Sequence, residues 1–229
     1  MKTVYRYFVQ PQMDIRTHAI FGYELLMKKL TPEGWRLPES FAAIDLHTVS
    51  DLLIKTTKIL GTKVEYCSVN VSREQLMDTE MTQALIKSQL QIYPTKLVVE
   101  LTEEEGPRNY LDITLIPHLR NFMEHGMQIS LDDVGTGDND FNNIRDFLPL
   151  ASEMKFALQN FRSLKDHHIH EKLLGWQEIS QKYGLRLILE GVEDKKDEEM
   201  INKLGINLRQ GYYYGKPELL KLPGDPSNM

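Results

Sequence analysis

Short apolar stretches recur along this chain, and from about residue 65 onwards helical patterns separate them. Their length and their β-branched and aromatic content are typical of strands. The predicted strands cover residues 4–10, 19–27, 65–71, 96–101, 127–131, 152–156, 185–189 and 206–213. The predicted helices cover residues 41–60, 72–90, 108–125, 141–147, 165–183 and 195–204. Strands that alternate with helices of this length indicate a parallel α/β sheet.

The first two predicted strands depart from this alternation. Only residues 14–18 separate them, which favours a β-hairpin and therefore one antiparallel strand. Since no linker and no second half follow, a single closed (β/α)-type barrel is favoured over a doubly wound sheet. We expect one domain over residues 1–229, with the barrel over about 1–217 and a C-terminal tail over 218–229, of which residues 222–229 are expected to be frayed.

Two local signals refine the predicted helices. Ser72 and Gln75 form a capping-box pattern at the start of the helix over 72–90. Pro117 lies inside the helix predicted over 108–125, where it should kink or interrupt that helix.

Composition narrows the function classes. The 229 residues are 41% hydrophobic and 26% charged, which describes a soluble globular protein. No apolar run reaches the length of a membrane span or a secretory signal, and Cys67 is the single cysteine, so we expect a cytoplasmic location and no membrane contact. A net charge of -6 gives no basic surface for long nucleic acids. A phosphate ligand would need a metal ion as intermediary.

Polar residues fall in or just beyond nearly every predicted strand. They are Glu24, Asn70, Glu100, Asp132, Asp133, Lys155, Glu190 and Gln210. In a parallel barrel the carboxyl ends of the strands share one face, so these side chains should converge in one pocket. Oxygen and amide ligands point to Mg²⁺ or Mn²⁺ rather than zinc, and two such ions suit phosphoester cleavage.

Most of these residues also have a structural alternative. The paired aspartates resemble an ordinary acidic turn before Gly135, and Glu24 and Glu190 suit solvent-facing strand ends. Lys155 suits a surface lysine and Gln210 a hydrogen-bonded turn residue. The joint pattern, more than any single residue, favours the metal site.

The ordered motifs resemble the EAL-domain cyclic-di-GMP phosphodiesterases almost from end to end. They are Val9-Gln10-Pro11, Gly22-Tyr23-Glu24-Leu25-Leu26, Ser68-Val69-Asn70-Val71-Ser72, Val99-Glu100-Leu101-Thr102-Glu103, Leu131-Asp132-Asp133-Val134-Gly135-Thr136-Gly137, Met154-Lys155, Leu189-Glu190-Gly191-Val192-Glu193 and Gln210-Gly211-Tyr212-Tyr213-Tyr214-Gly215-Lys216-Pro217. The resemblance implies a modified TIM (β/α)8-like barrel with an antiparallel first strand, in agreement with the predicted hairpin.

The resemblance also implies residue roles. The implied metal ligands, for two Mg²⁺ or Mn²⁺ ions, are Glu24, Asn70, Glu100, Asp132 and Asp133. Lys155 is implied to orient or deprotonate the attacking water, with Glu190, Gln210 and Asp133 completing the catalytic set. The implied substrate contacts are Gln10, Leu26, Lys28 and Asp132, and Glu103 is implied to anchor the loop after Asp133. The implied reaction opens cyclic-di-GMP to linear pGpG.

Several positions depart from the family pattern. The signature Glu-Ala-Leu is Glu24-Leu25-Leu26, and Lys28 replaces an arginine, so a bidentate phosphate contact is lost. Val134 replaces a phenylalanine, and Asp138-Asn139-Asp140 replaces Tyr-Ser-Ser. Ala157 replaces the aspartate of a Lys-x-Asp pattern. These departures leave the implied metal ligands intact.

Two function hypotheses follow. The first is a metal-dependent phosphodiesterase, and the second is a non-enzymatic member that binds cyclic-di-GMP or a regulatory protein partner. The retained carboxylates favour the enzyme. The resemblance also implies a homodimer, because family members commonly dimerise.

One further group of residues has two interpretations. His167, His168 and His170 alternate in a way that suits zinc, but they open a predicted helix away from any strand end. A solvated helix start is therefore favoured.

Overall fold

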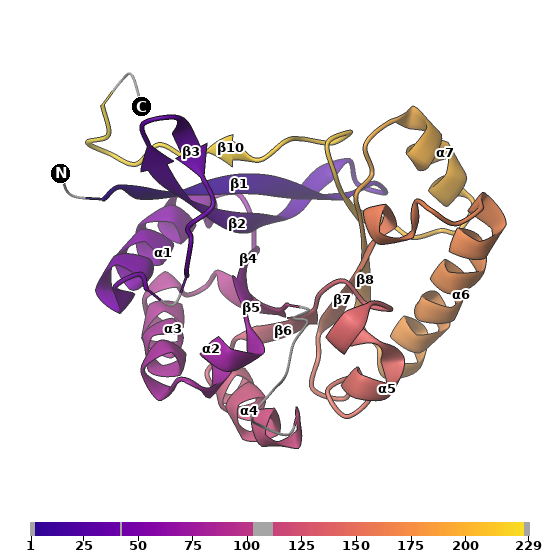
Figure 1. Cartoon of the computed structure of the whole chain (residues 1–229), viewed down its shortest axis with the longest axis horizontal. Coiled ribbons are helices and arrows are strands. Elements are labelled where there is room, and N and C mark those ends of the chain that lie inside the picture. The colour runs from indigo at the N-terminus through magenta and orange to yellow at the C-terminus, as the bar shows by residue number, and fades with distance from the viewer. Residues whose placement is uncertain (1–2, 42, 103–111, 227–229) are drawn as a thin grey trace.

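The computed structural model describes residues 3–41, 43–102 and 112–226, and in this part of the chain eight strands close into a barrel (Figure 1). The barrel strands are β1 (Tyr5–Asp14), β2 (Ala19–Thr31), β4 (Tyr66–Val71), β5 (Lys96–Leu101), β6 (Gln128–Leu131), β7 (Glu153–Ala157), β8 (Arg186–Glu190) and β9 (Leu208–Gln210). Two short strands, β3 (Gly34–Arg36) and β10 (Glu218–Leu219), extend the sheet beyond the barrel. The predicted barrel is confirmed.

The barrel closes through its first strand. β1 pairs antiparallel with β2 on one side and with β9 on the other, whereas β2 and β4 to β9 run parallel to one another. The β1–β2 hairpin turns at Asp14 and Ala19, as the pattern predicts. The antiparallel first strand is therefore confirmed, and the carboxyl ends of the seven parallel strands share one rim of the barrel.

Helices cover the outside of the barrel (Figure 1). They are α1 (Leu46–Leu60), α2 (Arg73–Met77), α3 (Thr79–Ile92), α4 (Ile116–Glu124), α5 (Phe141–Ile144), α6 (Asp166–Tyr183) and α7 (Lys195–Asn202), with 3₁₀ turns η1 (Asp112–Leu115), η2 (Gly137–Asn139) and η3 (Leu158–Phe161). Among the described residues no helix combines the length and the apolar character needed to cross a bilayer.

The strands are buried on both faces, as parallel strands covered by helices should be. Leu97, Val99 and Leu101 of β5 are fully buried, as are Ile129 and Leu131 of β6. This packing leaves little freedom to the residues that end each strand, so the strands hold their carboxyl-terminal side chains at fixed places.

Two predicted helices begin or break elsewhere than expected. The helix expected over 41–60 begins at Leu46, because Asp45 caps it by accepting a hydrogen bond from Thr48 N at 2.9 Å. The helix expected over 72–90 has the predicted capping box at Ser72 but stops at Met77. Asp78 then caps a new helix, α3, which continues to Ile92.

Pro117 does not kink a long helix. It lies in the first turn of α4, where a proline costs no hydrogen bond, and the preceding residues form η1. The helix predicted over 108–125 is therefore confirmed for residues 116–124, and it is interrupted just before Pro117, where residues 112–115 form η1. Residues 103–111 lie outside the described part of the chain.

The chain end is also more ordered than expected. The last barrel strand stops at Gln210, and the C-terminal tail begins with β10, which pairs with Phe8 and Val9 of β1. Asp225 accepts hydrogen bonds from Arg6 Nε at 2.9 and 3.1 Å. The prediction of a frayed tail is wrong up to Pro226.

Candidate active site

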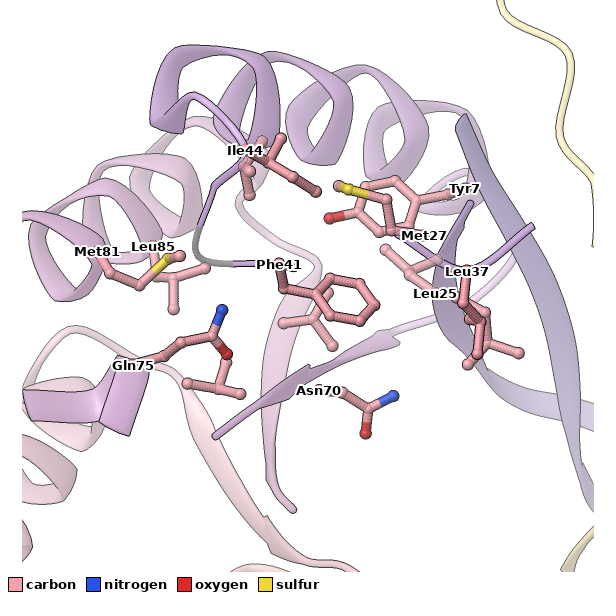
Figure 2. A pocket seen from close by; sticks show the side chains of 14 residues that line it. Tyr7, Leu25, Met27, Leu37, Phe41, Ile44, Asn70, Gln75, Met81 and Leu85 are labelled. Carbon is pink, nitrogen blue, oxygen red and sulfur yellow. The ribbon is translucent and has the colours of Figure 1, made fainter. Parts of the chain in front are cut away.

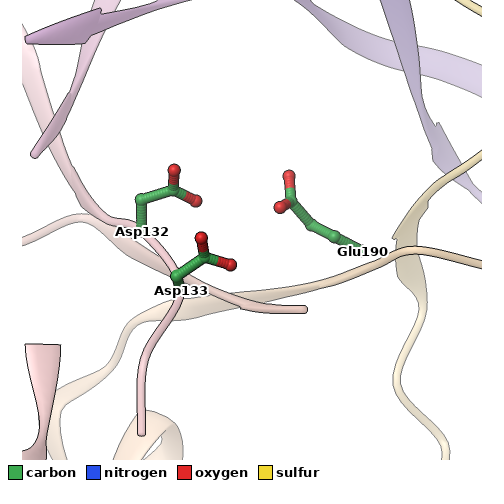
Figure 3. Close-up of side chains that lie close together, drawn as sticks. All are labelled: Asp132, Asp133 and Glu190. Carbon is green, nitrogen blue, oxygen red and sulfur yellow. The ribbon is translucent and has the colours of Figure 1, made fainter. Parts of the chain in front are cut away.

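Five carboxylates from four strands meet at the carboxyl-terminal rim of the barrel. We call them the acidic cluster: Glu24, Glu100, Asp132, Asp133 and Glu190. Glu24 belongs to β2, Glu100 to β5 and Glu190 to β8, while the two aspartates directly follow β6. Figure 3 shows the carboxylates of Asp132, Asp133 and Glu190 directed toward a common space. One carboxylate oxygen from each of these three lies within 4.8 Å of the others.

Lys155 on β7 lies at the centre of this cluster and is fully buried. Its Nζ is 2.5 Å from Glu190 Oε1, 2.8 Å from Glu100 Oε2, 3.4 Å from Glu24 Oε2 and 3.8 Å from Asp132 Oδ1. One ammonium thus faces four carboxylates. The prediction that strand ends bring these residues together is correct.

Side-chain amides orient Glu24. The exposed Asn70 donates from Nδ2 to Glu24 Oε1 at 2.8 Å, and Gln210 Nε2 donates to Glu24 Oε2. Gln210 Nε2 also lies 3.3 Å from Gln10 Oε1, and Gln10 donates to Gly215 O. Gln10 stands opposite Glu24 in the β1–β2 register. A chain of amides therefore connects β1 and β9 to the cluster.

Burial and mutual repulsion perturb the ionisation of the cluster. Burial raises the pKa of Asp132 to about 7 and that of Glu190 to about 8, despite the opposing effect of Lys155. For the same reason the pKa of Glu100 lies well above its usual value. Burial alone would raise the pKa of Glu24, but Lys155 and the amides of Asn70 and Gln210 lower it.

The pKa of Lys155 shifts in the direction opposite to the one that burial favours. Burial favours the neutral amine, yet the surrounding carboxylates, Glu100 foremost, raise the pKa of Lys155 well above its usual value. The side chain is therefore an ammonium and a hydrogen-bond donor in this arrangement.

The cluster fits divalent cations. Among the residues that the structure describes, Glu100 Oε1 and Asp132 Oδ1 are buried and accept no hydrogen bond. Buried carboxylate oxygens without a donor are costly, and a hard cation would satisfy them. Oxygen ligands suit Mg²⁺ or Mn²⁺ better than a soft metal.

Asp133 has an unusual backbone. Its φ of 48° lies in the left-handed region, which turns its carboxylate toward Glu190 and Asp132. Asn160 on the turn after β7 donates from Nδ2 to Asp133 Oδ1 at 2.9 Å. Asn160 is not among the predicted site residues, although it is a polar residue shortly after a predicted strand, which is the signal that identifies the others.

The remaining predicted residues do not all join the cluster. Strand alternation places Leu26 and Lys28 on the face of β2 that carries Glu24. Lys28 Nζ lies 4.2 Å from the centre of the Phe8 ring, and no ion pair joins it to the acids among the described residues. Glu103, the predicted loop anchor, lies outside the described residues.

A cavity lies beside the site, between the barrel wall and helices α1 and α3. This cavity of about 270 Å³ is lined mainly by apolar side chains, among them Leu25, Phe41 and Met81 (Figure 2). Asn70 is shared between this cavity and the acidic cluster. The apolar lining offers no ligands for a cation.

His167 and His168 at the start of α6 are exposed. The rings of His167 and His168 contact each other at 3.9 Å, but across the described residues the group with metal-binding geometry is the one formed by Asp132, Asp133 and Glu190. The exposure of His167 and His168 agrees with the predicted solvated helix start.

Comparison with known proteins shows to which family the chain is similar. The family model described as "EAL domain" matches residues 3–217. The chain is 27% identical over 224 residues to the signaling protein YkoW of Bacillus subtilis, covering 91% of this chain and 27% of that protein. It is 31% identical over 153 residues to the cyclic di-GMP phosphodiesterase PdeR of Escherichia coli, covering 66% of this chain and 22% of that protein.

Solved structures share the fold. The phosphodiesterase PaMucR, in complex with c-di-GMP, superposes with a TM-score of 0.76 at 21% identity over 93% of this chain and 92% of that one. A standalone EAL protein from Vibrio cholerae O395, in its c-di-GMP-bound form, gives a TM-score of 0.74 at 21% identity over 95% and 94%. The curated relatives are longer, and this chain spans about a quarter of the length of YkoW and PdeR.

Proposed function

Because the chain belongs to the EAL domain family, we propose that it is a metal-dependent phosphodiesterase that hydrolyses cyclic-di-GMP to linear pGpG. The observation that carries this proposal is the position of Lys155, buried among four carboxylates at the carboxyl-terminal rim of the barrel. A buried ammonium inside a set of metal-ligating oxygens is suited to charged phosphoester chemistry.

The proposed ligands divide between two ions. Glu24, Asn70, Glu100 and Asp132 would hold one Mg²⁺ or Mn²⁺, and Asp133 together with Asp132 the other. When bound, such ions lower the pKa of a water and neutralise charge on the phosphate. Asn70 and Gln210 orient Glu24, so that both of its oxygens have fixed directions.

Lys155 and Glu190 would act on the water and the phosphate. As an ammonium, Lys155 donates hydrogen bonds that orient the attacking oxygen and stabilise negative charge developing on the phosphate. Glu190 holds that ammonium at 2.5 Å. Hydrolysis adds one water: its oxygen bonds to phosphorus, the bond from phosphorus to the 3′ oxygen breaks, and a proton goes to that leaving oxygen.

The test is product analysis with cyclic-di-GMP and saturating Mn²⁺. We expect pGpG from the unmodified protein and a loss of at least about 100-fold in rate for Lys155→Ala. Lys195→Ala is the matched control, because that lysine is exposed on α7 and its rate should be unchanged. Absence of linear product from the unmodified protein would refute the proposal.

A second candidate function rests on the departures at Leu25, Lys28, Val134 and Ala157. Val134 and Ala157 are fully buried apolar residues beside the site. A regulator that binds cyclic-di-GMP without cleaving it would keep the pocket and lose turnover. Tight binding by calorimetry together with no pGpG would favour this candidate.

A further inference from the structure

A buried arginine lies beneath the loop that follows the paired aspartates. Arg73 is the first residue of α2, directly after β4, and its exposure is 0%. The side chain of Asn139 in η2 is also fully buried, although it is 66 residues away in sequence. Buried polar groups of this size are retained only when hydrogen bonds compensate for the lost water.

The guanidinium of Arg73 holds two different segments. Nη1 donates to Thr102 O at 2.8 Å, just beyond β5. Nη2 donates to Asn139 Oδ1 at 2.7 Å and to Asp138 O at 3.2 Å. The arginine thus joins the end of β5 to the loop after β6.

Asn139 connects Arg73 to the main chain of Asp132. Its Nδ2 donates to Leu101 O at 3.0 Å and to Asp132 O. Asp132 N in turn donates to Leu101 O at 3.2 Å. With Oδ1 held by Arg73, the Asn139 amide has one orientation, in which its NH₂ group points at the main chain of Asp132.

The loop closes on itself around that amide. Asn139 N donates to Thr136 O at 2.9 Å, and Gly135 N donates to Asn139 O at 3.0 Å. Thr136 Oγ1 donates to Asp133 O at 2.7 Å. The carbonyl groups of both aspartates are therefore fixed by hydrogen bonds from this loop.

We propose that Arg73 is a positioning residue for Asp132 and Asp133, acting through Asn139 to hold both carboxylates ready for a divalent cation. This inference rests on the proposed metal-dependent function. It also assigns a role to one of the departures from the family pattern, since Asn139 is part of Asp138-Asn139-Asp140. Arginine is required because one ammonium does not present separate nitrogens to Thr102 and Asn139.

The experiment measures binding of Mn²⁺ alone, by electron paramagnetic resonance, without nucleotide. Arg73→Lys and Asn139→Ser are each expected to weaken Mn²⁺ binding about tenfold, the scale of residues that orient metal ligands. Because both act through the same amide, the double variant should be no more than about twofold weaker than either single one.

Controls separate positioning from general stability. Arg186→Lys changes an arginine that pairs with Glu153 at the opposite end of the barrel, so its Mn²⁺ affinity should equal that of the unmodified protein. Circular dichroism checks the fold of each variant. If Arg73→Lys fails to fold, Asn139→Ser decides the question.

Two results would overturn the proposal. The first is an unchanged Mn²⁺ affinity in a folded Asn139→Ser variant. The second is a loss of Mn²⁺ affinity in the double variant equal to the product of the losses in the two single variants. Neither depends on turnover. Failure of the phosphodiesterase proposal would instead appear as absent pGpG from the unmodified protein, so the two failures are distinguishable.

Discussion

At the scale of single residues, the main feature of the site is an excess of carboxylates over the single ammonium of Lys155. Lys155 lies within 3.8 Å of four carboxylates, and burial raises the pKa values of Glu100, Asp132 and Glu190. A protein can relieve such repulsion by protonation or by binding cations. Glu100 Oε1 and Asp132 Oδ1 are buried and accept no hydrogen bond among the described residues, which favours cations as the functional solution.

Asn160 provides a test at this scale. Its hydrogen bond to Asp133 Oδ1 fixes a carboxylate whose backbone is already in the left-handed region. We expect Asn160→Ala to weaken Mn²⁺ binding about fivefold, equivalent to one hydrogen bond of about 1 kcal/mol.

Asn143→Ala is the matched control for this measurement. Asn143 lies in the same region, but its side chain does not contact Asp133: Nδ2 donates a long hydrogen bond of 3.4 Å to Gly137 O, and the main-chain hydrogen bond from Asn143 N to Asp140 O is kept in the alanine variant. Titration of Mn²⁺ by calorimetry compares the two variants. Equal affinities in Asn160→Ala and the unmodified protein would contradict a role for Asn160 in holding Asp133.

At the scale of elements, helix caps decide where the outer layer begins and ends. Asp78 ends α2 and begins α3, and its Oδ1 accepts hydrogen bonds from Glu80 N at 2.8 Å and Met81 N at 3.4 Å. The apolar pattern of 72–90 is continuous through Asp78, which is why the pattern alone predicts a single helix. The spacing of apolar residues therefore does not reveal that Asp78 caps a new helix.

The Asp78 cap can be tested by substitution. Asp78→Ala should lower the free energy of unfolding by about 1 kcal/mol, because two backbone donors lose their acceptor, whereas Asp78→Ser should keep most of it. Asp51→Ala, which removes an exposed i,i+4 pair with Lys55, should cost less than about 0.5 kcal/mol. Urea unfolding measures all three, and equal costs for Asp78→Ala and Asp51→Ala would disprove the cap.

The sequence predicts some elements and site residues correctly and misses others. The strand over 96–101 is found at its true bounds, because Lys96 to Leu101 is a short apolar run between helical patterns. The site is predicted where polar residues end strands, since barrel geometry then brings them together. The pattern does not predict the roles of Arg73 and Asn139, because neither is a single polar residue at the end of an apolar strand. Only the structure shows that the two side chains are buried together.

At the scale of the whole molecule, the two ends of the described chain are joined through β1. β10 pairs with Phe8 and Val9, and beyond it Asp225 accepts hydrogen bonds from Arg6 and from Leu222 N. The hydrogen bond from Arg6 is the main reason that the pKa of Asp225 is lowered. The return of the tail therefore adds a charged contact to the strand that closes the barrel.

This contact gives a prediction about pH. A carboxyl group whose pKa is lowered in the folded state stabilises the fold above its unfolded pKa of about 3.9, and this stability is lost as pH falls through the folded pKa. Asp225→Asn should therefore cost about 1 kcal/mol at pH 7 and progressively less below about pH 4. Urea unfolding from pH 7 to pH 3.5 measures the difference.

The exposed Asp146→Asn variant serves as the control for the pH series. Asp146 lies 3.6 Å from Arg145 on the surface, so its substitution should change stability little at any pH. A cost for Asp225→Asn that stays constant down to pH 3.5 would show that Asp225 contributes through packing rather than through its charge.

The reversed direction of β1 also decides where the chain enters the molecule. In a barrel whose strands all run parallel, the chain enters at the rim opposite the carboxyl-terminal ends. Here Tyr5 pairs with Lys29, beyond Glu24 on the side of the acidic cluster, and five residues of strand, about 17 Å, separate it from Gln10. If cyclic-di-GMP binds at the acidic cluster as proposed, a fluorophore attached just before Tyr5 would lie within energy-transfer range of the labelled nucleotide.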